Sequence, residues 1–202
     1  MSLHYAPWEQ PILRAPRQNE RLNLAELIIL AGDPPPGFPS TMRKGRTPID
    51  LAARRMSMRW EAFCRKYALV CDIEGRVAGM MLGYRLACEG DTPKLAGLCP
   101  SLRPLSGLED RRPASFYINT LAVYPRHQDN GLGAFLLSGA EKKARKAHCT
   151  CLLLEVSAQN AVALRFYARH GFMAWEGRGE ALPSAGTIVV LEKPLSRPDS
   201  TG

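Results

Sequence analysis

One segment of the chain combines residue types that could hold a phosphate group. Residues Gln128–Gly133 follow an apolar run ending at Val123, place glycines at 131 and 133, and lead into a helical pattern from Leu132. A glycine-containing turn at the start of a helix directs consecutive backbone N–H groups toward one point, at the positive end of the helix dipole. Glycine is needed there because a side chain would block the approach of a ligand to the backbone. The segment therefore predicts an anion site suited to phosphate.

Two better-known phosphate loops do not fit this segment. A Walker loop requires Gly-Lys-Ser/Thr at the helix start, but Leu132 and Ala134 follow the two glycines. A dinucleotide fingerprint requires a third glycine where Leu136 stands, and the preceding strand is not the first of the chain. The pattern that matches is Gln/Arg-x-x-Gly-x-Gly/Ala over Gln128–Gly133. By itself it is equally consistent with a tight turn before a helix.

Strand and helix patterns alternate on both sides of this loop. Apolar and β-branched runs predict strands at Ile12–Ala15, Tyr67–Ile73, Val77–Leu86, Ser115–Val123, Cys151–Val156, Phe172–Glu176 and Thr187–Leu191. Helical spacing predicts helices over Leu22–Ile29, from Thr47 through Phe63, over Leu132–Ala147 and over Asn160–His170. Asn160 is the expected N-cap of the last helix and Gly171 its stop. The order β-α-α-β-β-β-α-β-α-β-β predicts one α/β domain, with a mixed, mostly antiparallel sheet of about six or seven strands and about four helices.

In this context the loop resembles the GNAT superfamily of N-acetyltransferases. The resemblance is carried by Leu121-Ala122-Val123 before Pro125, by Gln128–Gly133, by Leu154-Glu155-Val156, and by Asn160 and Tyr167 before Gly171-Phe172. It extends over Ile12–Leu195 in element order and is specific in Tyr117–Phe172. It implies a single acetyltransferase domain over residues 1–202.

The resemblance implies that acetyl-CoA is the cosubstrate and that no metal takes part. The pantetheine arm would replace a strand where Leu121–Val123 separates from the next strand, and the pyrophosphate would bind the N–H groups of residues 129–134. A backbone N–H of Leu121–Val123 would polarise the thioester carbonyl. The expected cofactor-binding residues are Leu121, Ala122, Val123, Gln128, Asp129, Asn130, Gly131, Leu132, Gly133, Ala134, Asn160 and Tyr167.

Basic residues near the loop have two interpretations. Arg126 and His127, together with the helix face of Lys142, Arg145 and Lys146, could offset the remaining phosphate charge. This charged helix face, which also carries Glu141 and Lys143, is equally consistent with solvated charges. It lies opposite an apolar face formed by Leu132, Phe135, Leu136, Ala140, Ala144 and Ala147.

Tyr167 and Glu155 are the expected catalytic residues. In the resemblance, Tyr167 lies beside the cofactor sulfur and donates a proton to the departing thiolate, a transfer compatible with ordinary pKa values of about 8.5 for a thiol and about 10 for tyrosine. The alternative is a core aromatic residue next to Phe166. Glu155 matches the base of the family branch that acts on ribosomal-protein N-termini, and its alternative is an ion-paired glutamate at a strand end.

The position where other branches carry a glutamate base is Tyr117 in this sequence. The strand Ser115–Val123 contains no carboxylate, which argues against a base on that strand. Water relayed by Asn119 or Tyr117 remains an alternative, and proximity and orientation alone could supply most of the rate.

Two unusual segments are expected to shape the acceptor site or a dimer contact: the proline-rich loop 32–46 and the insertion 88–113. Residues Met56, Met58, Trp60 and Phe63 could line that site, although helical spacing more often marks core residues. The expected reaction transfers an acetyl group to a primary amine of a small molecule or peptide, by direct attack in a ternary complex. The alternative function is an acyl-CoA-binding sensor with little turnover. A homodimer is expected only because dimers are common among soluble proteins.

Composition limits the remaining function classes. The 202 residues are 46% hydrophobic and 23% charged, with 27 Lys and Arg against 19 Asp and Glu, a net charge of +8. Such a surface favours polyanions, but the basic residues are dispersed and no nucleic-acid-binding motif is present, so nucleic acid is not an expected partner. No apolar run approaches the roughly 20 residues of a membrane span, and residues 1–8 lack signal-peptide order. We expect a cytoplasmic protein with a polar tail at 197–202.

The six cysteines form no CxxC pair and no paired Cys/His ligand spacing. They predict reduced, mostly buried thiols rather than a zinc site. Cys149 and Cys151 are expected to face the same side of the sheet.

Overall fold

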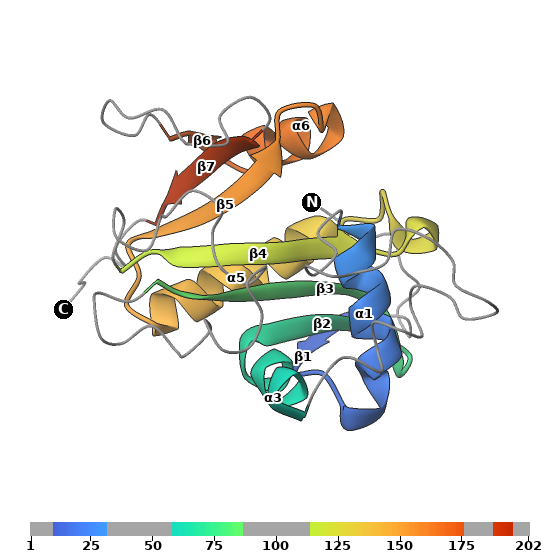
Figure 1. Ribbon diagram of the computed structural model, residues 1–202. Helices are drawn as coiled ribbons and strands as arrows, with labels where there is room; N and C mark the ends of the chain where they lie inside the picture. The colour runs from blue at the N-terminus through green and yellow to red at the C-terminus, as the bar shows by residue number, and fades with distance from the viewer. Residues whose placement is uncertain (1–9, 32–57, 87–113, 176–187, 196–202) are drawn as a thin grey trace, which may run out of the picture.

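The computed structural model describes residues 10–31, 58–86, 114–175 and 188–195 (Figure 1). Several predictions lie outside these residues: the loop 32–46, the helix start at Thr47, Met56, the insertion 88–113 and the tail 197–202. None of the helices within the described ranges combines the length and apolar character needed to cross a bilayer.

Seven strands form one mixed sheet in the order β1-β2-β3-β4-β5-β7-β6. Neighbouring strands pair antiparallel except β4 and β5, which pair parallel. The strands are β1 (Ile12–Arg14), β2 (Ala68–Ile73), β3 (Arg76–Arg85), β4 (Phe116–Val123), β5 (Cys151–Ser157), β6 (Met173–Ala174) and β7 (Ile188–Pro194).

Four α-helices of the described residues cover the two faces of this sheet. They are α1 (Arg21–Leu30), α3 (Met58–Tyr67), α5 (Leu132–Lys146) and α6 (Ala161–Arg169). One hydrophobic cluster joins α1 and α3 to the sheet, and a second joins α5 and α6 to the opposite face. Figure 1 shows α1 and α3 in front of the sheet and α5 behind it. The predicted α/β fold and element order are confirmed.

Some element ends differ from the prediction for local physical reasons. Tyr67 ends α3 instead of opening β2, and its ring packs on Phe63 one helical turn earlier, with centroids 4.6 Å apart. Phe63 is buried in the core, as helical spacing favoured. The β2–β3 hairpin has a two-residue turn of Glu74 and Gly75, with φ of 51° and 80°. Two consecutive left-handed residues match the twist of a tight hairpin.

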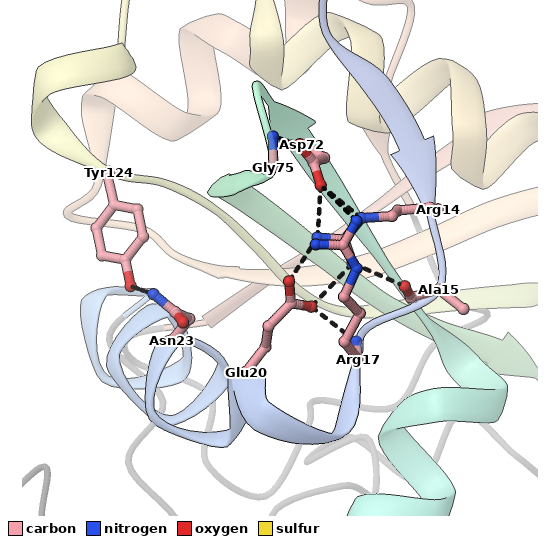
Figure 2. A network of polar contacts seen from close by, with 8 residues as sticks. All are labelled: Arg14, Ala15, Arg17, Glu20, Asn23, Asp72, Gly75 and Tyr124. Atoms are coloured by element: carbon pink, nitrogen blue, oxygen red, sulfur yellow. Dashed lines mark hydrogen bonds and ion pairs between the residues drawn. The ribbon is translucent and has the colours of Figure 1, made fainter.

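A buried polar network fastens the N-terminal strand to β2 (Figure 2). The guanidinium of Arg14 donates from Nε to Asp72 at 2.6 Å and from Nη1 to Glu20 at 2.9 Å. Asp72 also accepts the backbone N–H of Gly75 at 2.6 Å. The network therefore links β1, the turn before α1 and the β2–β3 hairpin.

Helix α5 packs closely on the sheet through its predicted apolar face. Leu132, Leu136, Ala140 and Ala144 are all buried. At Gly139 the contact is so close that a Cβ atom would lie 2.6 Å from Leu13 Cδ1.

Lys143 does not lie on the solvated face where the sequence placed it. Its Nζ donates to the carbonyls of Lys66 and Tyr67 at the end of α3, both at 3.2 Å, and burial lowers its pKa. The residue therefore links two helices on opposite faces of the sheet.

The described cysteines, Cys64, Cys71, Cys149 and Cys151, are buried and form no disulfide within the described residues. The expectation that Cys149 and Cys151 share a side is wrong, because they belong to the clusters on opposite faces. Cys149 precedes β5 and follows His148, whose φ is 54°, so strand alternation does not apply to it.

The parallel pair β4–β5 forks partway along its length. Only Phe116–Ile118 pair with Leu152–Leu154, whereas β4 runs on to Val123 and β5 to Ser157. The register with β3 moves from Gly83↔Ile118 to Leu82↔Thr120, which leaves Asn119 as an extra residue at the point of separation. Figure 1 shows β5 rising away from β4 beyond their common start. The separation expected for Leu121–Val123 is therefore present and begins after Ile118.

Candidate active site

The loop after β4 has the backbone geometry of an anion cradle. A short 3₁₀ turn, Pro125–His127, leads to Asp129 and Gly131, which are both left-handed with φ of 61° and 79°. Asp tolerates this conformation, and glycine adopts it without strain. Gly131 is the N-cap of α5 and provides no side-chain cap. The N-cap residue of this helix therefore supplies no side-chain acceptor to its first N–H groups.

Two polar side chains of the loop stabilise its shape. Gln128 Nε2 donates to the Val123 carbonyl at 3.0 Å, and Asn130 Nδ2 donates to the Gln128 carbonyl at 3.1 Å. The Phe135 N–H bonds back to the Gly131 carbonyl at 3.0 Å. The N–H groups of the first helical turn before it have no helical acceptor.

Residues 132–134, which follow Gly131, differ in what they contact. The Leu132 side chain is buried in the cluster beneath α5. Gly133 faces α6, because a Cβ atom there would lie 3.2 Å from the Phe166 ring. Ala134 lies on the same first turn, half-buried. The structure thus brings the predicted residues 128–134 together at one end of α5.

The basic residues named from the sequence lie at two different places. Arg126 and His127 adjoin the loop, and Arg126 Nε contacts His127 Nε2 at 3.1 Å. Burial, followed by the charge of Arg126, lowers the pKa of His127. Lys142, Arg145 and Lys146 lie ten or more residues into α5, about 15 Å or more from its N-terminus. That distance favours their interpretation as solvated charges.

The last residues of β4 present one paired and one open edge. Leu121, Ala122 and Val123 pair with β3 opposite Met81, Met80 and Gly79. Within the described part of the chain, no strand pairs with their other edge, which faces the fork. Buried backbone groups of such an edge need a partner.

Helix α6 begins and ends as the sequence predicts. Asn160 is its N-cap and accepts the Ala163 N–H at 3.0 Å. Gly171, with φ of 81°, ends it, and the Phe172 N–H bonds to the Tyr167 carbonyl at 3.1 Å. These caps fix the position of Tyr167 on the face that packs toward the sheet.

Tyr167 is buried between two aromatic neighbours. Its ring centroid lies 5.2 Å from Phe166 and 5.3 Å from Phe172. Burial raises the pKa of the Tyr167 phenol above its ordinary value, so the hydroxyl stays protonated at neutral pH. The residue has the packing of a core aromatic and the protonation state of a donor.

Glu155 lies on the opposite face of the sheet and has a tyrosine partner. The Tyr117 hydroxyl donates to Glu155 Oε2 at 3.0 Å. Tyr117 belongs to the cluster under α1 and α3, and its ring contacts Tyr84 edge-on at 5.7 Å. Beside this bond, both interpretations of Glu155, a base or an ion-paired glutamate at a strand end, stay predictions.

The loop is also tied to α1 by a contact that the sequence did not reveal. The Tyr124 hydroxyl donates to Glu26 Oε2 at 2.5 Å and accepts from Asn23 Nδ2 at 3.2 Å; Figure 2 shows the Asn23 contact. Burial, and then the bond to Glu26, raises the pKa of Tyr124 to about 12. These pairs lie about 100 residues apart, so local patterns carry no signal for them.

Within the described residues, no group of three or more His, Cys, Asp or Glu side chains is arranged to hold a metal ion.

Comparisons with known proteins agree with this geometry. Residues 41–172 match the family model of the acetyltransferase (GNAT) family. The comparison with curated proteins finds no match.

Solved structures share the fold at low sequence identity. A GNAT-family acetyltransferase described as putative, from Desulfovibrio desulfuricans, is 19% identical with a TM-score of 0.58, covering 92% of this chain and 99% of its own. The PaiA N-acetyltransferase from Thermoplasma acidophilum, solved with coenzyme A, is 15% identical with a TM-score of 0.59 and the same coverages. The ribosomal-protein-S18-alanine N-acetyltransferase from Escherichia coli is 16% identical with a TM-score of 0.52, covering 96% and 99%.

Proposed function

The chain belongs to the acetyltransferase (GNAT) family, and from this membership we propose that it moves an acetyl group from acetyl-CoA to a primary amine by direct attack in a ternary complex. Acetyl-CoA-dependent acyl transfer by an N-acetyltransferase is the activity of the family. The amine acceptor, the ternary complex and the residue roles below are our proposal. We treat residues 1–202 as one such domain.

The described residues fit coenzyme A at two points. The left-handed Gly131 leaves the first-turn N–H groups of α5 open to the pyrophosphate. The open edge of Leu121–Val123 supplies backbone groups that can pair with the amides of the pantetheine arm. Acetyl-CoA, when bound, supplies an activated thioester.

The observation that supports the proposal is that Tyr167 and Glu155, the two residues to which we assign proton transfer, lie on opposite faces of the sheet at the fork. Tyr167 belongs to the α5/α6 face and Glu155 to the α1/α3 face. Because the sheet is open between β4 and β5 beyond Ile118, groups on the two faces can act on one acetyl group held there. An amine then approaches from one face while the thiolate leaves toward the other.

Tyr167 donates a proton to the departing thiolate in this proposal. Burial keeps its phenol neutral, so a proton is present at any working pH near neutrality. The caps of α6 and the Phe166 and Phe172 rings hold the side chain in one orientation. General acid catalysis of this kind is worth about 10²–10⁴-fold in rate.

Glu155 accepts the proton of the attacking amine. Its carboxylate is on the face that α1 and α3 cover, away from the phosphate loop. A backbone N–H of Leu121–Val123 polarises the acetyl carbonyl from the open edge of β4. The acceptor in this proposal is a primary amine of a small molecule or peptide.

We also propose a cytoplasmic location. The buried thiols of the described residues form no disulfide, which fits a reducing compartment.

Thiol release from acetyl-CoA, measured across a panel of small amines and peptides with free N-termini, tests the proposal. Tyr167→Phe should lose about 10²-fold or more in kcat while its affinity for acetyl-CoA is retained. Tyr67→Phe, which removes a hydroxyl from the aromatic group under the opposite face, is the matched control and should turn over normally. Unchanged kcat in Tyr167→Phe would exclude it as the proton donor. Acetyl-CoA binding without turnover on any amine would favour the sensor function.

A further inference from the structure

We propose that Tyr117 is a positioning residue for Glu155: its hydroxyl holds the carboxylate at the fork in the orientation that a base requires. This inference rests on the proposed function, because it assigns Glu155 the role of base.

The hydrogen bond crosses from the paired to the separated part of the two strands. Tyr117 pairs with Leu153 in the last rungs of the β4–β5 ladder. Glu155 lies two residues further along β5, beyond the final rung at Leu154. The Tyr117 hydroxyl reaches it at 3.0 Å to Oε2. Past the fork, no backbone bond from β4 to β5 is present among the described residues, so this side-chain bond connects Glu155 to β4 at a point where the ladder has ended.

Tyr117 is itself held rigidly. The residue is 3% exposed, and its ring meets Tyr84 at a centroid distance of 5.7 Å and an angle of 63°. Tyr84 in turn contacts Phe63 and Tyr67 of α3, each at 6.2 Å. The aromatic group therefore connects α3 to the fork and directs one phenol toward Glu155.

The hydrogen-bond donor at this point comes from β4 and not from β7. Glu192 of β7 lies on the same face, opposite Leu153 and diagonal to Glu155, but a second carboxylate is not a donor. Lys193 points to the other face, where it pairs with Glu141 of α5 at 2.6 Å. A hydrogen bond to a charged group is stronger than one between neutral groups, so the Tyr117 hydroxyl is suited to orient the Glu155 carboxylate.

Side-chain carboxyl NMR tests the proposal without an acceptor. The full chain, labelled with ¹³C at the glutamate carboxyls and saturated with acetyl-CoA, is compared with its variants at pH 7, and Glu155→Gln assigns the Glu155 resonance. In Tyr117→Phe, which keeps the ring but loses the hydroxyl bonded to Glu155, the Glu155 carboxyl resonance should shift. Tyr67→Phe, which removes a hydroxyl from the same aromatic group, should not move it. If Tyr117→Phe unfolds, the Cζ signal of labelled Tyr117 should differ between the unaltered chain and Glu155→Gln.

The overturning results are distinct from those of the proposed function. An unmoved Glu155 carboxyl resonance in folded Tyr117→Phe overturns the positioning role, as does a Tyr117 Cζ signal that is the same in the unaltered chain and in Glu155→Gln. With n-butylamine as the probe amine, kcat should fall in Tyr117→Phe, with KM for acetyl-CoA unchanged. Full turnover by Glu155→Gln would instead remove Glu155 as base, and the role of Tyr117 in catalysis with it, even where the NMR shift is seen.

Discussion

The two faces of the fork are built from different kinds of interaction. On the α5/α6 face, the site consists of a left-handed glycine, a helix N-terminus and a tyrosine fixed by helix caps. On the α1/α3 face, it depends on side-chain bonds between distant residues, Tyr117 to Glu155 and Tyr124 to Glu26. The first face relies on backbone geometry and the second on tertiary packing. If the proposed roles hold, we expect acetyl-CoA binding to depend mainly on local backbone geometry and acceptor chemistry to depend on contacts between distant residues.

The largest expected effect is on kcat, and it distinguishes Glu155, the proposed base, from Glu192 on the same face of the sheet. Glu155→Gln should reduce kcat about 10²–10⁴-fold with the acceptor found by screening, because a proton acceptor is lost. Glu192→Gln removes a carboxylate on the same face of the adjacent strand and should leave kcat within a few-fold. Equal losses in the two variants, measured as thiol release, would mean that general electrostatics and not a base is at work.

A large effect on stability, without one on the site, is expected at the network that fastens β1. Arg14→Met leaves Asp72 and Glu20 buried without their cation, and should lower the free energy of unfolding by about 3–5 kcal/mol. Arg17→Met is the control: its side chain is 55% exposed and lies 3.7 Å from Asp72, so the cost should be about 1 kcal/mol or less. Urea unfolding measures both, and acetyl-CoA affinity should be unchanged in each folded variant.

The same network predicts a pH dependence. Burial alone would raise the pKa of Glu20, but the hydrogen bonds from Arg14 and the Arg17 N–H lower it overall. A lowered folded pKa gives stability that is present above the ordinary value of about 4.3 and lost as pH falls through the folded value. Arg14→Met should lose this contribution, so its disadvantage should shrink below pH 4. A gap that stays constant down to pH 2 would contradict this assignment.

Substitutions at two glycines of α5 should have smaller effects on different properties, one mainly on stability and the other mainly on acetyl-CoA affinity. Gly139→Val crowds Leu13 and Leu69 and should cost about 1–3 kcal/mol of stability, with acetyl-CoA affinity intact. Gly133→Val meets only the Phe166 ring at 3.2 Å, and should weaken acetyl-CoA binding more than it weakens folding. Calorimetry measures acetyl-CoA affinity and urea unfolding measures stability in both variants. Similar losses of affinity and stability in the two variants would contradict this prediction.

Local features of the site could be predicted from the sequence, whereas features that depend on contacts between distant residues could not. The Asn160 cap, the Gly171 stop and the glycine-containing turn before the helix at Leu132 are local features, so residue type and spacing were sufficient to predict them. The extra residue Asn119 and the Lys143 bonds to α3 depend on register and on contacts between distant elements. Amphipathic spacing placed Lys143 on the solvated face, because spacing within one helix carries no information about the end of a neighbouring helix. Glu155 was named from a resemblance, but its partner came only from the packed sheet.

The most direct test is calorimetric titration of the chain with acetyl-CoA, in the unaltered form and in two arginine variants. Gly131 and Gly75 have nearly the same positive φ, 79° and 80°, so arginine at either should cost a similar strain of about 1–2 kcal/mol. Only Gly131 lies at the proposed phosphate cradle, and the space around Gly75 is open. We predict micromolar binding by the unaltered chain and by Gly75→Arg, and loss of binding in folded Gly131→Arg. Absence of binding by the folded unaltered chain, or full binding by Gly131→Arg, would contradict the assignment of this loop to acetyl-CoA.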